Sequence, residues 1–430
     1  MRRFSRTWLF LFFAATLALA GCASQDLRKA PRPEDVGLST PALQAYTEAL
    51  RAKVDAGEIP GAVLLVARDG KVAWELALGW RDREAKVPMS TDSLFRMASM
   101  TKPVTAVAVL MLVDEGKIRL NDPLSKFIPE FAGVQVGVES VDAAGKPQLA
   151  LEPAKAPIRI IDLLRHTSGL TYGIFGHSLV KSRYNAANLF DSNQTNAEFG
   201  AKIARLPLQW QPGSHWEYSM SFDVLGRVVE VASGMEFSEF LRARLFTPLR
   251  MDHTGFRVDA AQLPLLAQPQ VNPATGKRPA MWEVEKSPRW AAGGHGLVST
   301  ADDYARLCQM LLNDGVLDGV RILSPQSARM LHTDVLQTPL PGPTPKVSIS
   351  SPSVDNGNGF GLGVVVRTAQ GGNDIPGSIG DYGWFGFYGT LFWIDPKQNM
   401  FAMLLVQVPS PANLPLRRAA REAVYRAVLK

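Results

Sequence analysis

Phe95-Arg-Met-Ala-Ser99-Met-Thr-Lys102-Pro103 is the stretch of this 430-residue chain that decides its fold. It leads directly into the apolar residues 104–113, and this pattern predicts a helix that begins near Ser99. Pro103 is tolerated there because it falls in the first helical turn. Residues three apart share a face of a helix, so we expect Lys102 to reach the Ser99 hydroxyl. The free N–H groups at a helix start also favour negative charge on that hydroxyl.

A lysine buried beside a serine can lose its proton more easily and act as a base, which makes the serine a nucleophile. The alternative is that Ser99 is an ordinary N-cap and Lys102 is solvated. A second match to the same spacing, Ser178-Leu-Val-Lys181, lies in a segment without a strong pattern. Context therefore favours the first pair as the site of chemistry.

A tyrosine in a loop supplies a second candidate group. Trp216-Glu-Tyr218-Ser-Met-Ser221 precedes an apolar helical pattern. A tyrosine at such a place can relay a proton between a nucleophile and a leaving group. The alternative is a partly buried tyrosine whose hydroxyl is simply hydrogen-bonded.

The start of a glycine-containing strand near the C-terminus supplies a third candidate element of the site. It reads Gly383-Trp384-Phe-Gly386-Phe387-Tyr-Gly-Thr. Glycines in a strand allow a substrate to approach the backbone closely. The alternative is an aromatic-rich edge strand without a binding role.

The N-terminal residues 1–21 read as a signal peptide. Three arginines lie within the first six residues, and the apolar run at 8–19 is too short for a membrane-spanning helix. The box Leu19-Ala-Gly-Cys22 that follows resembles a bacterial lipoprotein signal, which implies lipidation of Cys22. The next residue is Ala23, not Asp, which implies export to the outer membrane, facing the periplasm. The alternative is a plain signal peptide with a nearby cysteine.

Composition and missing motifs exclude several classes of function. Hydrophobic residues make up 46% and charged residues 20% of the chain, an ordinary globular balance. The formal net charge is +6, and about +3 once the three arginines of residues 1–21 are removed, which is too mild to indicate nucleic-acid binding. The chain lacks a phosphate-binding loop, a Gly-x-Ser-x-Gly elbow and metal-ligand spacing of histidines or cysteines. We therefore expect no metal and no cofactor, and we expect Cys308 to be a buried apolar residue.

Strand signals occur near both ends of the chain, with helical patterns between them. Asp69-Gly70 joins the apolar runs 62–67 and 72–78, a strong hairpin signal. Residues 359–367, 383–394 and 400–407 read as three further strands, and 415–429 as a final helix. The pattern predicts an α/β (α+β) protein with one antiparallel sheet built from both chain ends, flanked by helices.

The predicted organisation has four parts. Residues 22–38 form a polar tether, residues 39–155 and 290–430 form the sheet domain, and residues 156–289 form an inserted, mainly helical domain. Within the sheet domain, residues 132–157 read as an irregular excursion. Residues 337–358 read as a long loop that borders a site.

The order Ser-x-x-Lys, then Tyr, then a glycine-containing strand start resembles class C serine β-lactamases, penicillin-binding proteins and their esterase relatives. The resemblance spans about residues 39–408 and implies a β-lactamase/transpeptidase-like fold. It rests also on the stretches 157–170, 292–304, 317–325 and 392–396. His166 and His295 fall inside these stretches, and we expect both to be structural.

The resemblance implies a role for each matching residue. Ser99 would be the acylated nucleophile, activated by Lys102 together with Tyr218. Tyr218 would also pass the proton to the leaving group. The oxyanion hole would consist of the backbone N–H groups of Ser99 and Phe387. Whether Lys102 or Tyr218 is the base stays open.

Two departures from the lactamase pattern bear on the substrate. Met220 stands where lactamases have an asparagine, which Ser219 or Ser221 would partly replace. Trp384 stands where lactamases have the lysine of Lys-Thr-Gly, ahead of the shared Gly386. Without that lysine, a β-lactam carboxylate loses a charge-assisted contact. The pattern therefore favours an esterase for short-chain or small acyl groups.

Other activities of the same fold remain as alternatives: a class C-like β-lactamase, a penicillin-binding D-amino-acid peptidase or an acyltransferase. A non-catalytic lipoprotein is disfavoured because Ser99, Lys102 and Tyr218 are all present. The expected partners are a small ester or amide substrate and a membrane, reached through a lipid on Cys22. The basic helix near the C-terminus is expected to present a solvated face.

Overall fold

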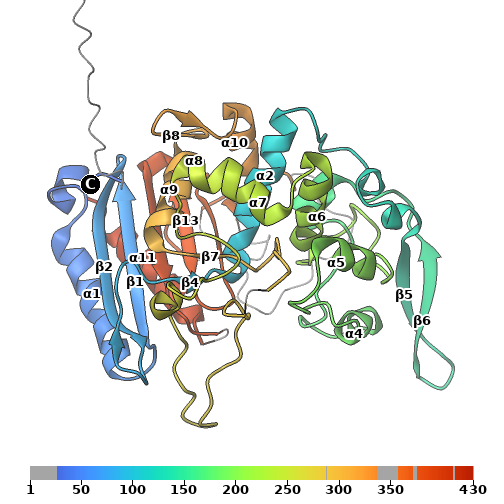
Figure 1. The fold of residues 1–430 in the computed structure, drawn as a ribbon, viewed down its shortest axis with the longest axis horizontal. Coiled ribbons are helices and arrows are strands. Elements are labelled where there is room, and N and C mark those ends of the chain that lie inside the picture. Colours follow the sequence, from blue (N-terminus) through green and yellow to red (C-terminus); the bar gives the residue numbers. More distant parts are fainter. Residues whose placement is uncertain (1–26, 287, 337–356, 371–374, 410–411, 430) are drawn as a thin grey trace, which may run out of the picture.

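The computed structural model describes residues 27–286, 288–336, 357–370, 375–409 and 412–429. Its centre is an eight-stranded antiparallel sheet of order β10-β11-β12-β13-β14-β1-β2-β3. Strands from the two ends of the chain meet where β1 pairs with β14, with Val63 opposite Leu405. Figure 1 shows this sheet on one side of the molecule and a helical part on the other. The predicted antiparallel sheet from both chain ends is confirmed.

The strands of the large sheet are short in its C-terminal half and longer in its N-terminal half. They are β1 (Gly61–Arg68), β2 (Lys71–Asp82), β3 (Val87–Pro88), β10 (Asn358–Phe360), β11 (Val365–Arg367), β12 (Tyr382–Phe385), β13 (Leu391–Asp395) and β14 (Met400–Leu405). Three two-stranded sheets pair β4 (Phe95–Arg96) with β7 (Val298–Ser299), β5 (Gln135–Val141) with β6 (Pro147–Pro153), and β8 (Val316–Leu317) with β9 (Val320–Arg321).

The helices cover both faces of the sheet and fill the region between residues 156 and 289. They are α1 (Thr40–Asp55), α2 (Thr101–Asp114), α3 (Ile160–Leu164), α4 (Leu179–Ala186), α5 (Asn196–Ile203), α6 (Ser221–Ser233), α7 (Phe237–Leu241), α8 (Thr247–Leu249), α9 (Ala301–Leu312), α10 (Pro325–Leu331) and α11 (Leu414–Ala427). None of the described helices is long and apolar enough to cross a membrane.

Both faces of the sheet are buried, and β1 shows why its sequence is a continuous apolar run. Side chains alternate between the two faces of a strand. Val63 and Leu65 pack in the core that includes α2 and α9, whereas Leu64 and Val66 pack against α1 and α11. A strand covered on both faces needs apolar residues at every position.

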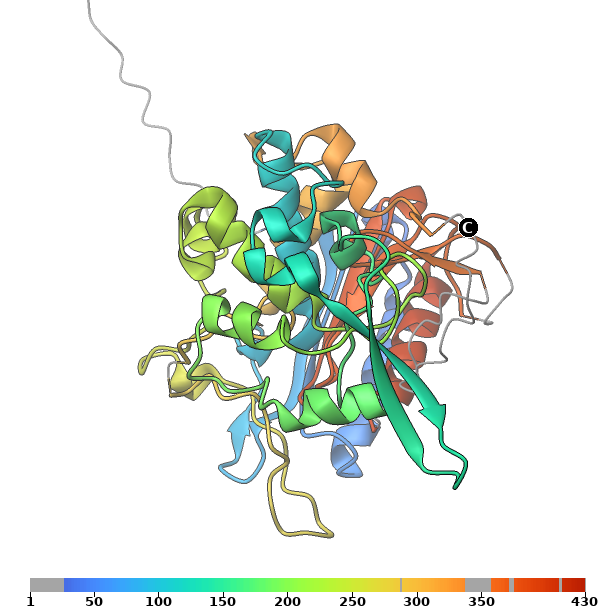
Figure 2. The ribbon, with the colours of Figure 1, turned by 90° about the vertical axis from the view of Figure 1, so that its right-hand side faces the viewer.

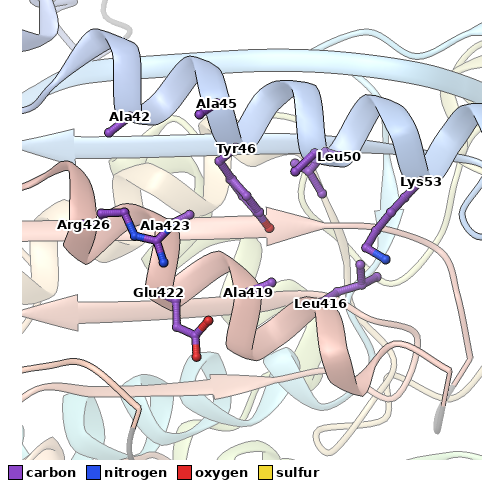
Figure 3. Close-up of a pocket in the computed structure, with 11 residues that line it drawn as sticks. Ala42, Ala45, Tyr46, Leu50, Lys53, Leu416, Ala419, Glu422, Ala423 and Arg426 are labelled. Carbon is purple, nitrogen blue, oxygen red and sulfur yellow. The ribbon is translucent and has the colours of Figure 1, made fainter.

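Helices α1 and α11 lie side by side on the outer face of the sheet (Figure 3). Ala42, Ala45, Ala419 and Ala423 line the shallow groove between them, where their small side chains allow the helices to approach. The Ser39 hydroxyl caps the start of α1 by accepting a hydrogen bond from the Ala42 N–H. This packing fixes the position of α11 against the strands that lead to the site.

On the inner face, α9 packs across β1, β13 and β14, and α2 lies between the sheet and the helical part. Because α6 packs against its far side, α2 is buried along Thr101–Leu112. This explains why the sequence of α2 is apolar all round and not amphipathic. It also places Lys102 in the interior.

The structure differs from the predicted elements in two places. The single strands expected at 359–367 and 383–394 are each two strands separated by a turn, β10–β11 and β12–β13. The irregular excursion expected at 132–157 contains the β5–β6 ribbon, which projects from the molecule beside α4 (Figures 1 and 2). Its outer end has exposed side chains on both faces, so the sequence carries no alternating pattern there.

The predicted signal peptide and Cys22 lie outside the described residues, as does most of the loop predicted at 337–358. Cys308 is fully buried on α9, and its burial raises the pKa of the thiol well above its usual value. A buried thiol of this kind is unreactive.

Candidate active site

Ser99 lies in a short 3₁₀ turn, Ala98–Met100, directly before α2. Ala98 has a φ of +46°, in the left-handed region that residues other than glycine rarely adopt. The surroundings hold this conformation: the Thr101 hydroxyl donates to the Ala98 carbonyl at 2.6 Å and accepts from the Leu297 N–H at 3.0 Å. Such strain costs about 1–3 kcal/mol and is concentrated at functional sites. Ser99 is thereby presented at the start of a buried helix.

The Lys102 side chain is fully buried beneath Ser99. Its Nζ lies 3.1 Å from the Ser99 Oγ, 3.2 Å from the Tyr172 Oη and 2.7 Å from the Gly294 carbonyl oxygen. An ammonium group has three hydrogens to donate, and three acceptors surround it here. Its charge also lies 4.7 Å from the centre of the Tyr218 ring. The site therefore suits a positively charged lysine.

The Tyr218 hydroxyl is the second group that contacts Ser99, and its Oη donates to the Ser99 Oγ at 2.6 Å. Aromatic rings hold the tyrosine in place. The Trp384, His166 and Phe175 rings lie 5.6, 4.9 and 5.9 Å from its centre. A serine with an acid–base group and a cation at these distances can act as a nucleophile.

The strand opposite Ser99 reaches the site because Gly386 has no side chain. A Cβ there would lie 2.4 Å from the Met97 carbonyl oxygen and 2.2 Å from the Thr390 Oγ1. The Thr390 hydroxyl donates to the same Met97 carbonyl at 3.0 Å, tying the turn after β12 to the segment before Ser99. Among the described residues, the Phe387 N–H that follows donates to no acceptor. It is therefore available to a ligand.

Ser219 and Ser221 lie elsewhere than the sequence suggested. Both are fully buried, and the Ser219 Oγ contacts the His166 Nδ1 at 3.0 Å and the Ser221 Oγ at 2.8 Å. Burial lowers the pKa of His166 well below its ordinary value, so the ring is neutral at pH 7. The serines therefore belong to a buried polar cluster behind Tyr218, and Ser219 has no access to a substrate.

Trp384 is also buried, with 2% of its surface exposed. Its ring packs against Tyr218 and Phe360. It supports the tyrosine from behind and presents little surface of its own. Phe387, in contrast, is 38% exposed at the rim of the site.

Two of the acceptors around the Lys102 ammonium group, the Tyr172 hydroxyl and the Gly294 carbonyl, were not identified from the sequence. Tyr172 lies two residues after the 157–170 stretch. Burial raises the pKa of its hydroxyl well above the usual value, so it stays neutral. The Gly294 peptide is held by Asp223, whose Oδ1 accepts the Gly294 N–H at 2.9 Å. The sequence signal for both was their place in or beside stretches that are typical of the family.

The second Ser-x-x-Lys pair, Ser178 and Lys181, makes contacts that stabilise the fold. The Ser178 hydroxyl caps α4 by accepting from the Lys181 N–H at 2.9 Å. The Lys181 ammonium group pairs with Glu217 at 2.9 Å and does not contact Ser178. In the described part of the chain no three His, Cys, Asp or Glu side chains come together as a metal site.

Comparisons with known proteins identify the family of the chain. The Beta-lactamase family model matches residues 47–426. An uncharacterized protein of Mycobacterium tuberculosis (strain CDC 1551 / Oshkosh) is 37% identical over 369 residues, which cover 85% of this chain and 90% of that protein. Esterase EstB of Burkholderia gladioli is 30% identical over 405 residues, covering 88% and 93%.

The solved structure of EstCE1, described as a hydrolase with promiscuous acyltransferase activity, matches with a TM-score of 0.71. Its sequence is 25% identical, and the match covers 90% of this chain and 99% of that one. The chain thus belongs to the β-lactamase family, as a serine hydrolase of its esterase branch.

Proposed function

We propose that the protein hydrolyses carboxylic esters through an acyl-enzyme on Ser99. The observation that carries this proposal is the pair of hydrogen bonds on the Ser99 Oγ, at 2.6 Å to Tyr218 and 3.1 Å to Lys102. A serine becomes a good nucleophile only when a neighbouring group takes its proton, and both neighbours are in reach.

In this mechanism Tyr218 acts as the phenolate, paired with the Lys102 ammonium. It takes the proton as the Ser99 Oγ attacks the ester carbonyl, and then gives it to the departing alkoxide. Lys102 keeps its proton, because its three acceptors suit an ammonium, and its charge stabilises negative charge on Ser99 and Tyr218. The N–H groups of Ser99 and Phe387 bind the oxyanion. Water then attacks the acyl-enzyme, and Tyr218 repeats its role in reverse.

The substrate is expected to be an uncharged ester with a small or apolar acyl group. The exposed side chains near Ser99 include Phe387 and Phe190, which are 38% and 41% exposed. Phe190 stacks on Tyr172, which itself contacts Lys102, so this apolar rim borders the site. At the position where lactamases carry a lysine, this chain has the buried Trp384. An apolar rim binds apolar groups best.

A comparison of two substrate classes tests this proposal. Purified protein is offered a p-nitrophenyl series (acetate, butyrate, octanoate) and a chromogenic cephalosporin. A hydrogen bond to a charged group contributes about 1.5–3 kcal/mol, so the kcat/KM for the best ester should exceed that for the cephalosporin at least about 10-fold. Equal or faster cephalosporin turnover would contradict the esterase assignment and favour a β-lactamase.

The same assay separates hydrolysis from acyl transfer. EstCE1 is described as a hydrolase with acyltransferase activity, and the apolar rim of this chain can also seat an alcohol. Butanol added to the ester reaction then yields butyl ester in competition with acid. Acylation of Ser99 without release of either product would instead favour a penicillin-binding protein.

We further propose that Cys22 carries a lipid that anchors the protein to the outer membrane, with the domain in the periplasm. The leader composition and the Leu19–Cys22 box support this proposal. Full-length protein expressed in a bacterial host should incorporate labelled palmitate and sediment with membranes, and Cys22→Ser should do neither. Unlabelled wild-type protein in the soluble fraction would contradict the anchor.

A further inference from the structure

An arginine on α11 contacts the turn that carries the proposed oxyanion donor. The Arg417 Nη2 donates to the Gly386 carbonyl oxygen at 2.9 Å, and the guanidinium lies 3.9 Å from the centre of the Phe385 ring. The side chain is 9% exposed. It therefore reaches the end of β12 from the outer side of the sheet, across from Ser99.

Among the residues that the structure describes, this arginine has no ion pair of the kind that a buried cation normally has. Burial lowers the pKa of Arg417 to about 10, so the side chain is still cationic at pH 7. Within the described residues its Nε and Nη1 have no acceptor. One helical turn later, Arg421 donates to Asp381 at 2.6 Å. A buried cation without a carboxylate partner is unfavourable for folding, so stability alone does not account for Arg417.

The bond to Gly386 acts on the Phe387 N–H because the two groups belong to one peptide unit. The Gly386 C=O and the Phe387 N–H lie in one plane and point in opposite directions. A cationic donor on the carbonyl draws electrons from the peptide and strengthens its N–H as a donor. Asn413, also next to α11, donates to the Phe387 carbonyl at 2.9 Å and fixes the following peptide.

We propose that Arg417 is a positioning residue for the oxyanion hole, which orients and polarises the Gly386–Phe387 peptide so that its N–H binds the developing oxyanion. The proposal rests on the function proposed above, in which Phe387 supplies that donor. Its effect arises only as negative charge develops on the substrate oxygen. It therefore raises kcat and leaves substrate binding unchanged.

Three variants test the proposal: Arg417→Met, Arg417→Lys and the matched control Arg421→Met. Loss of a whole oxyanion donor lowers kcat about 10²–10³-fold. Because Arg417→Met only weakens the donor, we expect kcat for p-nitrophenyl butyrate to fall about 10–100-fold, with KM within about twofold of wild type. Arg417→Lys keeps the charge and should recover part of the loss. Arg421→Met should lower the melting temperature and keep kcat.

A second readout addresses the oxyanion directly. Phenylboronic acid adds to the Ser99 Oγ as a tetrahedral anion that places an oxygen where the oxyanion forms. Its Kd should rise in Arg417→Met by the same factor by which kcat/KM falls, because both report binding of that oxygen. If Arg417 only stabilised the fold, the rise in Kd and the fall in kcat/KM would not match.

The outcomes separate this inference from the proposed function. If wild-type hydrolysis depends on Ser99 but Arg417→Met keeps wild-type kcat, this inference alone is overturned. It is overturned as well if Arg417→Lys and Arg421→Met lose as much activity as Arg417→Met in step with their melting temperatures. If Ser99→Ala hydrolyses the ester like wild type, the proposed function fails and this inference fails with it.

Discussion

Ser99→Ala is expected to lower kcat/KM for p-nitrophenyl butyrate by about 10⁴-fold or more, the usual scale for loss of a serine nucleophile. Alanine removes the atom to which both Lys102 and Tyr218 donate, the Oγ at 3.1 and 2.6 Å from them. The backbone is unaffected, since Ala98 and Thr101 hold the turn through their own contacts. Steady-state kinetics with active-site titration measure the loss, and intact-protein mass spectrometry with a fluorophosphonate shows whether the label is lost too.

Ser178→Ala is the matched control, because Ser178 heads the second Ser-x-x-Lys pair. It should keep wild-type kcat/KM and lose about 1 kcal/mol of stability, the usual effect of removing an N-cap. If fluorophosphonate labelling persisted in Ser99→Ala and disappeared in Ser178→Ala, the nucleophile would be Ser178 and the assignment of Ser99 would be wrong.

Tyr218→Phe is expected to lower kcat about 10²–10⁴-fold, the range for loss of a general acid–base group. The change removes one oxygen, 2.6 Å from the Ser99 Oγ, and leaves a ring that still packs on Trp384 and Phe175. Stability should therefore change little, whereas acylation and deacylation should both slow. Pre-steady-state kinetics with p-nitrophenyl butyrate measure the two steps separately.

Tyr172→Phe is the comparison for that variant. The Tyr172 hydroxyl contacts Lys102 at 3.2 Å. In the part of the chain that the structure describes, it makes no hydrogen bond to Ser99. The loss should be about 10-fold or less, because Lys102 keeps two of its three acceptors. If Tyr172→Phe were far slower than Tyr218→Phe, the proton would travel through Lys102, and Tyr218 would not be the base.

The sequence predicted the part of the site that depends on local geometry. Ser99 and Lys102 lie three apart at a helix start, so their contact follows from the helix itself. Tyr218 lies 119 positions later, and only the resemblance to a family associated it with them. The strands predicted in the two ends of the chain also form the one sheet that the antiparallel pattern required.

The rest of the site depended on packing between distant segments, which residue patterns do not reveal. Ser219 looked like a substrate contact because of its place after Tyr218, but the chain turns it inward toward His166. Arg417 looked like one charge of a solvated basic helix, and only the docking of α11 on the sheet brings it to Gly386. Neither position differs in residue type from many surface residues.

The meeting of the two chain ends in one sheet has a consequence for synthesis. Arg68, at the end of β1, bonds to Gln398, 330 positions later, and β14 follows directly. While the ribosome makes the chain, β1 cannot pair with its central neighbour β14 until about 330 further residues have been added, so the large sheet cannot form early in synthesis. The apolar strand β1 therefore stays exposed while the chain is made, and such exposed strands make an incomplete chain prone to aggregation.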